Sequence, residues 1–113
     1  MWRRMYHVTH QACVASIIEL GLLPDRSHGK IKAVWLADSK RLQWAIAHVS
    51  LKHSEAIAYL WVAVCHVDPR DLKRFRWPGI YLSEQIVPIF EIYPASAIIN
   101  RGPIRMAGNR SKI

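Results

Sequence analysis

The stretch "AIAYLWVAVCHV", residues 56–67, places the strongest constraint on what this chain can fold into. It is long and apolar, it is rich in β-branched and aromatic residues, and apolar and polar side chains do not alternate along it. Such a run is typical of a strand that is buried on both faces. We therefore expect residues 56–67 to form the central strand of a sheet. A chain of 113 residues, 51% of them hydrophobic, is long enough for one domain around that strand.

Two strand–helix units are expected before this strand. The first is a strand over 6–9 followed by a helix that ends at Gly21, because apolar residues recur at helical spacing between them. The second is a strand over 33–37 followed by an amphipathic helix in "DSKRLQWAIAHVSLKH" (38–53). Asp38 or Ser39 is expected to cap the N-terminus of this second helix, because either side chain can accept a backbone N–H there.

Strands are expected to dominate the second half of the chain. "DPRDLKRFRWPG" (68–79) is predicted to be a basic turn, and "IYLSEQIVPIFEI" (80–92) one or two strands, with Pro88 at an edge or a bulge. "YPASAII" then closes the fold. Helices early and strands late indicate the α+β class. The sequence has no GxGxxG after a strand and no GxxxxGK[ST], which argues against the ordinary dinucleotide and nucleoside-triphosphate folds.

The charge of the chain is strongly positive. Lysine and arginine number 16 against 8 aspartates and glutamates, which gives a formal net charge of +8. This balance favours an anionic partner such as nucleic acid, a phosphate-rich cofactor or an anionic surface. No window approaches the roughly 20 apolar residues that a membrane span needs. "MWRRMYHV" carries charges but no apolar signal region, so we expect a cytoplasmic protein with no membrane partner.

Cysteine and histidine spacing does not indicate a metal site. Cys13 and Cys65 lie in apolar settings without CxxC spacing, and we expect two buried free thiols in preference to a disulfide. The six histidines show neither HExxH nor Cys/His ligand spacing, so no metal is expected.

Four stretches, taken in order, resemble the small ADP-ribosyltransferase fold. They are "YHVT", "SIIELGLLP", "AVWLADS" and "LSEQIVPIFEIYPASAI". The chain is particularly similar to the NAD-binding lobe of RNA 2′-phosphotransferases and to compact nucleic-acid-modifying ADP-ribosyltransferases, over roughly residues 5–98. The resemblance implies a minimal split β-sheet with two main helices. It also implies one domain over residues 1–100. The remaining residues, 101–113, are expected to form a basic and partly mobile tail, because they are rich in basic residues and follow the last expected element.

The resemblance assigns the NAD-binding residues to two strands. His7 would hydrogen-bond the ribose of the nicotinamide half of NAD and assist catalysis, and Val8 and Thr9 would continue that strand along the ligand. Alternation along a strand independently puts His7 and Thr9 on one face, although both could simply decorate a sheet surface. Trp35, followed by Leu36, would stack on the nicotinamide or form its wall. Trp35 could equally belong to the core.

Glu84 is the candidate catalytic glutamate. The resemblance implies a glutamate at the start of a strand, followed by apolar residues and a proline segment that leads into the last strand, as in "SEQIVPIFEIYP". Its carboxylate would accept hydrogen bonds from the ribose and stabilise the positive charge that develops as nicotinamide leaves. The alternatives are that Glu84 is an exposed turn residue, or that Glu91 holds this position.

The segment "RDLKRFRW" is a candidate surface for single-stranded nucleic acid. Basic side chains would contact phosphates, and two aromatic side chains would stack on bases. The alternative is a solvated turn with its aromatic residues tucked into the core. The basic candidates are Arg70, Lys73, Arg74 and Arg76, and the aromatic residues are Phe75 and Trp77.

The sequence thus predicts an NAD-dependent ADP-ribosyltransferase that uses NAD as substrate, with nucleic acid as the favoured acceptor. An RNA 2′-phosphotransferase-like enzyme is one alternative, but no arginines match its phosphate-binding set convincingly. The other alternative is a catalytically inactive domain of the same fold that binds a nucleotide or a nucleic acid.

Overall fold

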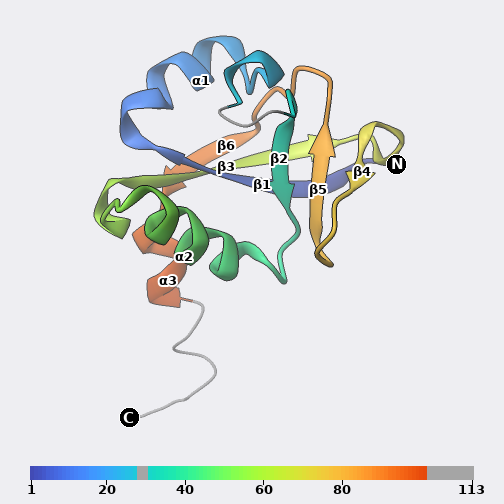
Figure 1. The fold of residues 1–113 in the computed structure, drawn as a ribbon. Helices are drawn as coiled ribbons and strands as arrows, with labels where there is room; N and C mark the ends of the chain where they lie inside the picture. Colours follow the sequence, from blue (N-terminus) through green and yellow to red (C-terminus); the bar gives the residue numbers. More distant parts are fainter. Residues whose placement is uncertain (28–30, 102–113) are drawn as a thin grey trace.

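The structure, a computed structural model, describes residues 1–27 and 31–101. The protein is an α+β domain built on a six-stranded antiparallel sheet, with strand order β4-β5-β2-β1-β3-β6 (Figure 1). The elements are β1 (Arg3–His10), η1 (Gln11–Cys13), α1 (Val14–Leu20), η2 (Pro24–Arg26), β2 (Val34–Ala37), α2 (Leu42–His53), η3 (Ile57–Tyr59), β3 (Leu60–Val67), η4 (Pro69–Asp71), β4 (Lys73–Arg74), β5 (Ile80–Ser83), β6 (Glu91–Pro94) and α3 (Ala95–Arg101).

Helices cover the sheet on both faces, which is why β2 and β3 carry apolar residues at nearly every position. Ile17 of α1 packs on one face with Met5 and other residues of β1, β2 and β3. Ile46 of α2 packs on the other face with Tyr6, and α3 lies on that same side (Figure 1). Ile46 is fully buried. Burial of such a side chain contributes about 1.5–3 kcal/mol to stability.

The expected central strand is shorter than predicted and lies off the centre of the sheet. Residues 57–59 form the 3-10 helix η3, and β3 begins at Leu60. Ser54 takes the left-handed conformation that ends α2 (φ 51°), so the chain turns before it can extend. β3 is paired on both sides, with β1 and with β6, while β1 and β2 occupy the middle of the sheet. Full pairing and two helical layers explain why β3 is buried on both faces.

Two helix boundaries differ from the sequence prediction. α2 begins at Leu42, with Arg41 as its N-cap, because residues 39–41 form a turn. Asp38 closes that turn by accepting the Arg41 backbone N–H at 3.0 Å. α3, which follows β6, was not predicted at all. It extends to Arg101, one residue past the expected domain boundary, and the rest of the predicted tail (102–113) lies outside the described residues.

The predicted basic turn over 68–79 contains a short strand. β4 pairs with β5, with Lys73 opposite Leu82. The tip of this hairpin carries Gly79, whose φ of 79° is in the left-handed region that favours glycine. The Gly79 carbonyl accepts the Asp38 backbone N–H at 2.9 Å. The hairpin tip is therefore held against the corner between β2 and α2.

The prediction of two buried thiols was half wrong. Cys65 is buried in β3, but Cys13 is exposed. Cys13 is the last residue of η1, the single turn that leads from β1 into α1, and no residue of η1 is buried. Both thiols are free.

Candidate functional site

The sheet divides between β1 and β2. β1 pairs with β3 along its whole length, from Arg3–Val67 to His10–Leu60. In contrast, within the described part of the chain β1 and β2 are registered at one residue pair, Tyr6–Ala37. Figure 1 shows β2 and β5 running steeply across the direction of β1 and β3. The two halves of the sheet therefore diverge immediately after Tyr6, at the position of His7.

His7 links the two halves through its side chain. Its Nδ1 lies 2.7 Å from the carbonyl oxygen of Trp35 in β2. A carbonyl oxygen can only accept, so Nδ1 carries the proton and donates. This bond leaves Nε2 as an acceptor, and no hydrogen-bond partner of Nε2 is found among residues 1–27 and 31–101. His7 therefore offers a lone pair from a fixed ring, which suits a ligand hydroxyl.

Burial keeps the His7 ring neutral. Loss of hydration lowers the pKa of His7 from its ordinary value of 6.5, and the hydrogen bond to the Trp35 carbonyl opposes this only in part. At neutral pH the imidazole is uncharged, with its proton on Nδ1. It can accept a hydrogen bond in this form, but it cannot supply a positive charge.

This lowered pKa predicts an acid-sensitive contribution to stability. The unfolded chain binds the His7 proton more tightly than the folded one, so the contribution is complete above about pH 6.5. It is lost as the pH falls from that value through the lower pKa of the folded state. We expect the free energy of unfolding, measured by urea titration, to fall less steeply below pH 6.5 in His7→Gln than in the wild type. Equal pH dependence of the unfolding free energy in the variant and the wild type would contradict a lowered pKa of His7.

The other predicted residues of these two strands divide between the two faces. Thr9 is buried and shares the α1 face with His7, as its register opposite Trp61 shows. Val8 lies on the opposite face, where it packs against the cluster around Tyr6. Leu36 is buried in the core on the α1 face. Its role in the structure is packing, with 2% of its surface exposed.

Trp35 meets His7 through its backbone and not through its ring. The register Tyr6–Ala37 and strand alternation put the indole on the α2 face, opposite to His7. There it packs edge-on against Phe75, with ring centroids 4.6 Å apart and an interplanar angle of 71°. Trp35 is thus anchored to the β4–β5 hairpin.

The two candidate glutamates lie at different ends of the sheet. Glu84 does not begin a strand as predicted; it directly follows β5 (Ile80–Ser83), the neighbour of β2. Its Oε1 accepts from Lys73 Nζ at 2.9 Å. Glu91 begins β6 at the far edge, where its carboxylate lies 3.7 Å from the Arg4 guanidinium. Both carboxylates are exposed. Glu84 belongs to the half of the sheet that β2 is in, whereas β3 and β1 separate Glu91 from β2.

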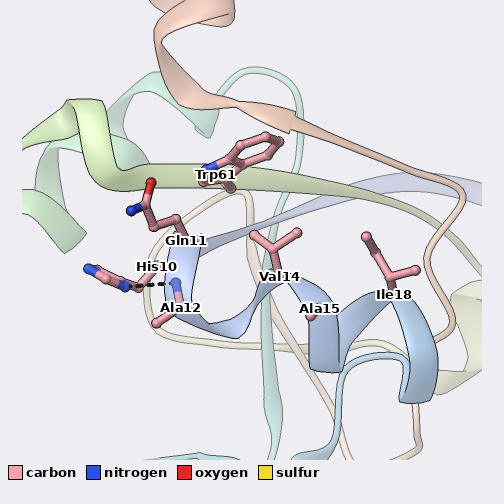
Figure 2. Close-up of a pocket in the computed structure, with 7 residues that line it drawn as sticks. All are labelled: His10, Gln11, Ala12, Val14, Ala15, Ile18 and Trp61. Carbon is pink, nitrogen blue, oxygen red and sulfur yellow. Dashed lines mark hydrogen bonds between the residues drawn. The ribbon is translucent and has the colours of Figure 1, made fainter.

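A pocket of about 540 Å³ opens at the C-terminal end of β1 (Figure 2). Its lining is mostly apolar, and the Trp61 ring stands over it, facing Val14 and Ile18 of α1. Because Trp61 is registered with Thr9, the pocket continues the face that carries His7 and Thr9. An apolar pocket with an aromatic wall suits a flat ring. The lining residues are His10, Gln11, Ala12, Val14, Ala15, Ile18 and Trp61.

His10 sits at the mouth of this pocket with both ring nitrogens engaged. Nδ1 accepts the Ala12 backbone N–H at 3.0 Å, so the proton is on Nε2, which lies 3.3 Å from Glu55 Oε2. His10 therefore shapes the pocket and has no free nitrogen for proton transfer in this arrangement. Sequence reasoning missed His10 and Trp61. The available signal was that His10 ends the strand that carries His7, and that Trp61 is the one tryptophan in the apolar run over 56–67.

Two of the four predicted basic residues are already paired. The Arg70 guanidinium binds the Asp68 carboxylate at 2.7 Å and holds its pKa at about 2. Lys73 is bound to Glu84. Arg74 and Arg76 are exposed, and no ion pair is found for either of them within the described ranges. The cationic charge of this segment that is free to meet an anion therefore comes from Arg74 and Arg76.

Nothing in the described part of the chain resembles a metal or thiol centre. No group of three histidine, cysteine or acidic side chains comes together there. Burial raises the pKa of the Cys65 thiol to about 12, so this thiol stays protonated at neutral pH. Among the same residues, no helix is long and apolar enough to cross a bilayer.

Comparison of the chain with protein-family models, with curated proteins and with solved structures gave no match.

Proposed function

We propose that this protein binds NAD at the division between β1 and β2 and transfers its ADP-ribose group, with nucleic acid as the acceptor. The observation that carries this proposal is the position of His7. It stands where the sheet splits, and its neutral ring keeps Nε2 open as an acceptor. The resemblance to ADP-ribosyltransferases implies this arrangement: a histidine lies on the first strand of a split sheet, and its ring accepts a hydrogen bond from a ribose hydroxyl.

The surroundings of His7 are compatible with a dinucleotide. Thr9 and the pocket under Trp61 continue the same face, so a ligand held at His7 would have an aromatic wall within its reach. The net charge of +8 favours an anionic pyrophosphate. In this proposal the ribose is bound at His7 and Thr9, and one flat ring of NAD enters the pocket.

Glu84 is the proposed catalytic carboxylate. It follows the strand next to β2, and in the proposed reaction it turns from Lys73 to the ribose as NAD binds. An exposed ion pair of this kind contributes at most about 1 kcal/mol, so releasing it costs little. Cleavage of the glycosidic bond would then transfer ADP-ribose to the acceptor and release nicotinamide.

The first test is NAD binding measured by calorimetry. We expect His7→Ala to weaken the binding of NAD about fivefold, because one hydrogen bond to a hydroxyl contributes on the order of 1 kcal/mol. His66→Ala is the matched control, since His66 is an exposed histidine of β3 that stacks on Phe90. Absence of NAD binding to the wild type at millimolar concentration, or equal binding by both variants, would overturn the proposal.

The second test separates an enzyme from an inactive domain. Wild-type protein is incubated with labelled NAD and single-stranded oligonucleotide, and nicotinamide release is followed together with label on the oligonucleotide. The proposal expects both products. Binding of NAD without nicotinamide release would favour the inactive nucleotide-binding domain instead. Activity only on an RNA that carries a 2′-phosphate would favour the phosphotransferase alternative.

A further inference from the structure

Four rings from two separate segments form a continuous aromatic surface on the α2 face of the sheet. Trp44 and His48 come from α2, and Phe75 and Trp77 come from the β4–β5 hairpin; we refer to these four residues as the aromatic surface. Trp44 stacks on His48 at 4.9 Å with an angle of 13° between the rings. Trp77 lies 5.6 Å from Trp44 and 5.6 Å from Phe75.

The two tryptophans remain well exposed although they contact each other. Trp44 keeps 38% of its surface exposed and Trp77 keeps 41%. Neither ring belongs to one of the two core clusters of the described residues. Because core packing does not account for these rings, a partner that covers them would gain additional buried aromatic area.

Guanidinium groups lie over the rings. The Arg41 guanidinium carbon is 5.8 Å from the centroid of Trp44, and that of Arg76 is 5.4 Å from the centroid of Phe75. The carboxylate at this corner, Asp38, is already engaged with the Arg41 backbone N–H and with Arg3. The aromatic surface is therefore flanked by two guanidinium groups, and the carboxylate of Asp38 is paired with Arg3 and with the Arg41 backbone, not with either of these guanidinium groups.

The rings are held in place before any partner arrives. The hairpin tip is docked by the hydrogen bond between the Asp38 N–H and the Gly79 carbonyl, and Phe75 is anchored against Trp35. Trp77 is thus brought to Trp44 by a backbone hydrogen bond and by the packing of Phe75 on Trp35, neither of which involves the ring of Trp44 or Trp77. A preorganised platform loses little conformational freedom on binding, so more of the stacking energy is available for affinity.

We propose that the aromatic surface binds single-stranded nucleic acid, with bases stacked on Trp44 and Trp77 and phosphates held by Arg41 and Arg76. Exposed rings interleaved with arginines are the arrangement that stacks bases and neutralises a sugar–phosphate backbone. A duplex hides its base faces and is bound less well. The binding needs no NAD. In the proposed function this surface is the site that holds the nucleic-acid acceptor, and only that role rests on the proposed function.

The test is fluorescence anisotropy of a labelled oligothymidylate, with a duplex of the same length as comparison and no NAD present. We expect Trp44→Leu and Trp77→Leu each to raise the Kd about five- to a hundredfold, the range for loss of one stacked base. Arg76→Glu should also weaken binding and reduce the dependence of log Kd on log salt. Trp44→Tyr keeps a ring and should retain most of the affinity. Retained affinity in this variant would show that the ring is what Trp44→Leu removes.

Phe90→Leu is the matched control. Phe90 is an exposed ring stacked on a histidine, His66, at 4.4 Å, and no guanidinium lies over it among the described residues. The variant Phe90→Leu should leave the Kd for oligothymidylate unchanged. Absence of binding at low salt, equal affinity for the duplex, or unchanged affinity in both tryptophan variants would each overturn the proposal. Nicotinamide release without oligonucleotide binding would overturn it while leaving ADP-ribosyl transfer to another acceptor in place.

Discussion

Glu84→Gln is expected to lower the rate of ADP-ribosyl transfer by about a hundredfold or more while NAD binding stays nearly unchanged. The positive charge on the ribose develops only as the bond to nicotinamide breaks, so a carboxylate aimed at it stabilises the transition state more than bound NAD. Loss of a comparable electrostatic group typically costs about 10²–10³ in kcat. Glutamine keeps the shape and one hydrogen-bonding oxygen, and single-turnover nicotinamide release measures the difference.

Two further variants make this prediction specific. Glu91→Gln should leave the rate unchanged, because β3 and β1 separate β6 from β2. Lys73→Met removes the cation that holds Glu84 at 2.9 Å, and should leave the rate unchanged or raise it. A rate loss in Glu91→Gln with none in Glu84→Gln would move the catalytic assignment to the other edge of the sheet. Continued turnover in both variants would exclude a glutamate at either position as the catalytic group.

The features that the sequence predicts well have local signals. The strand expected over 33–37 is found as β2 (Val34–Ala37). It could be predicted because its signal is local: a short apolar run lies between a polar loop and the start of a helix. The helix stop at Gly21 is confirmed, with φ at 78°, since glycine tolerates this conformation. Alternation puts His7 and Thr9 on one face of a strand, and the pairing with β3 agrees.

The features that were missed depend on contacts between distant segments. β4 has two residues and forms because β5 returns beside it, so no local pattern marks it. The His7–Trp35 bond exists because the sheet divides after Tyr6, and periodicity says nothing about where two strands part. Trp44 was read as part of an amphipathic helix, and its proximity to Trp77 follows only from the docking of the hairpin.

The ionic partners of the candidate residues could not be predicted from the sequence either. Glu84 and Lys73 are eleven positions apart and meet because β4 and β5 are antiparallel. Arg70 was counted among the nucleic-acid contacts, yet a turn brings its own neighbour Asp68 to it. Side-chain pairing of this kind decides which charges of a basic segment remain available, and it requires the folded backbone.

Gly79→Ala is expected to destabilise the protein by about 2 kcal/mol and to weaken oligonucleotide binding as well. A φ of 79° costs a residue with a Cβ about 1–2 kcal/mol. The new Cβ would also stand 2.5 Å from Arg41 Cγ and 2.9 Å from Asp38 Oδ1, so one side of this contact must shift, and we expect the hairpin tip to move away from the start of α2. That movement separates Trp77 from Trp44 and displaces Arg41. Urea titration measures the first effect and anisotropy the second.

Gly21→Ala separates the two effects. Its φ is 78°, and a Cβ there would lie 3.0 Å from the Val87 carbonyl oxygen, so a similar loss of unfolding free energy is expected. Gly21 is at the end of α1, on the opposite face of the sheet from the aromatic surface, and its replacement should leave the Kd for oligonucleotide unchanged. Equal loss of affinity in both variants would mean that binding follows global stability. Loss in Gly79→Ala alone would tie affinity to the contact between the hairpin and α2, because this contact sets the spacing of Trp44 and Trp77.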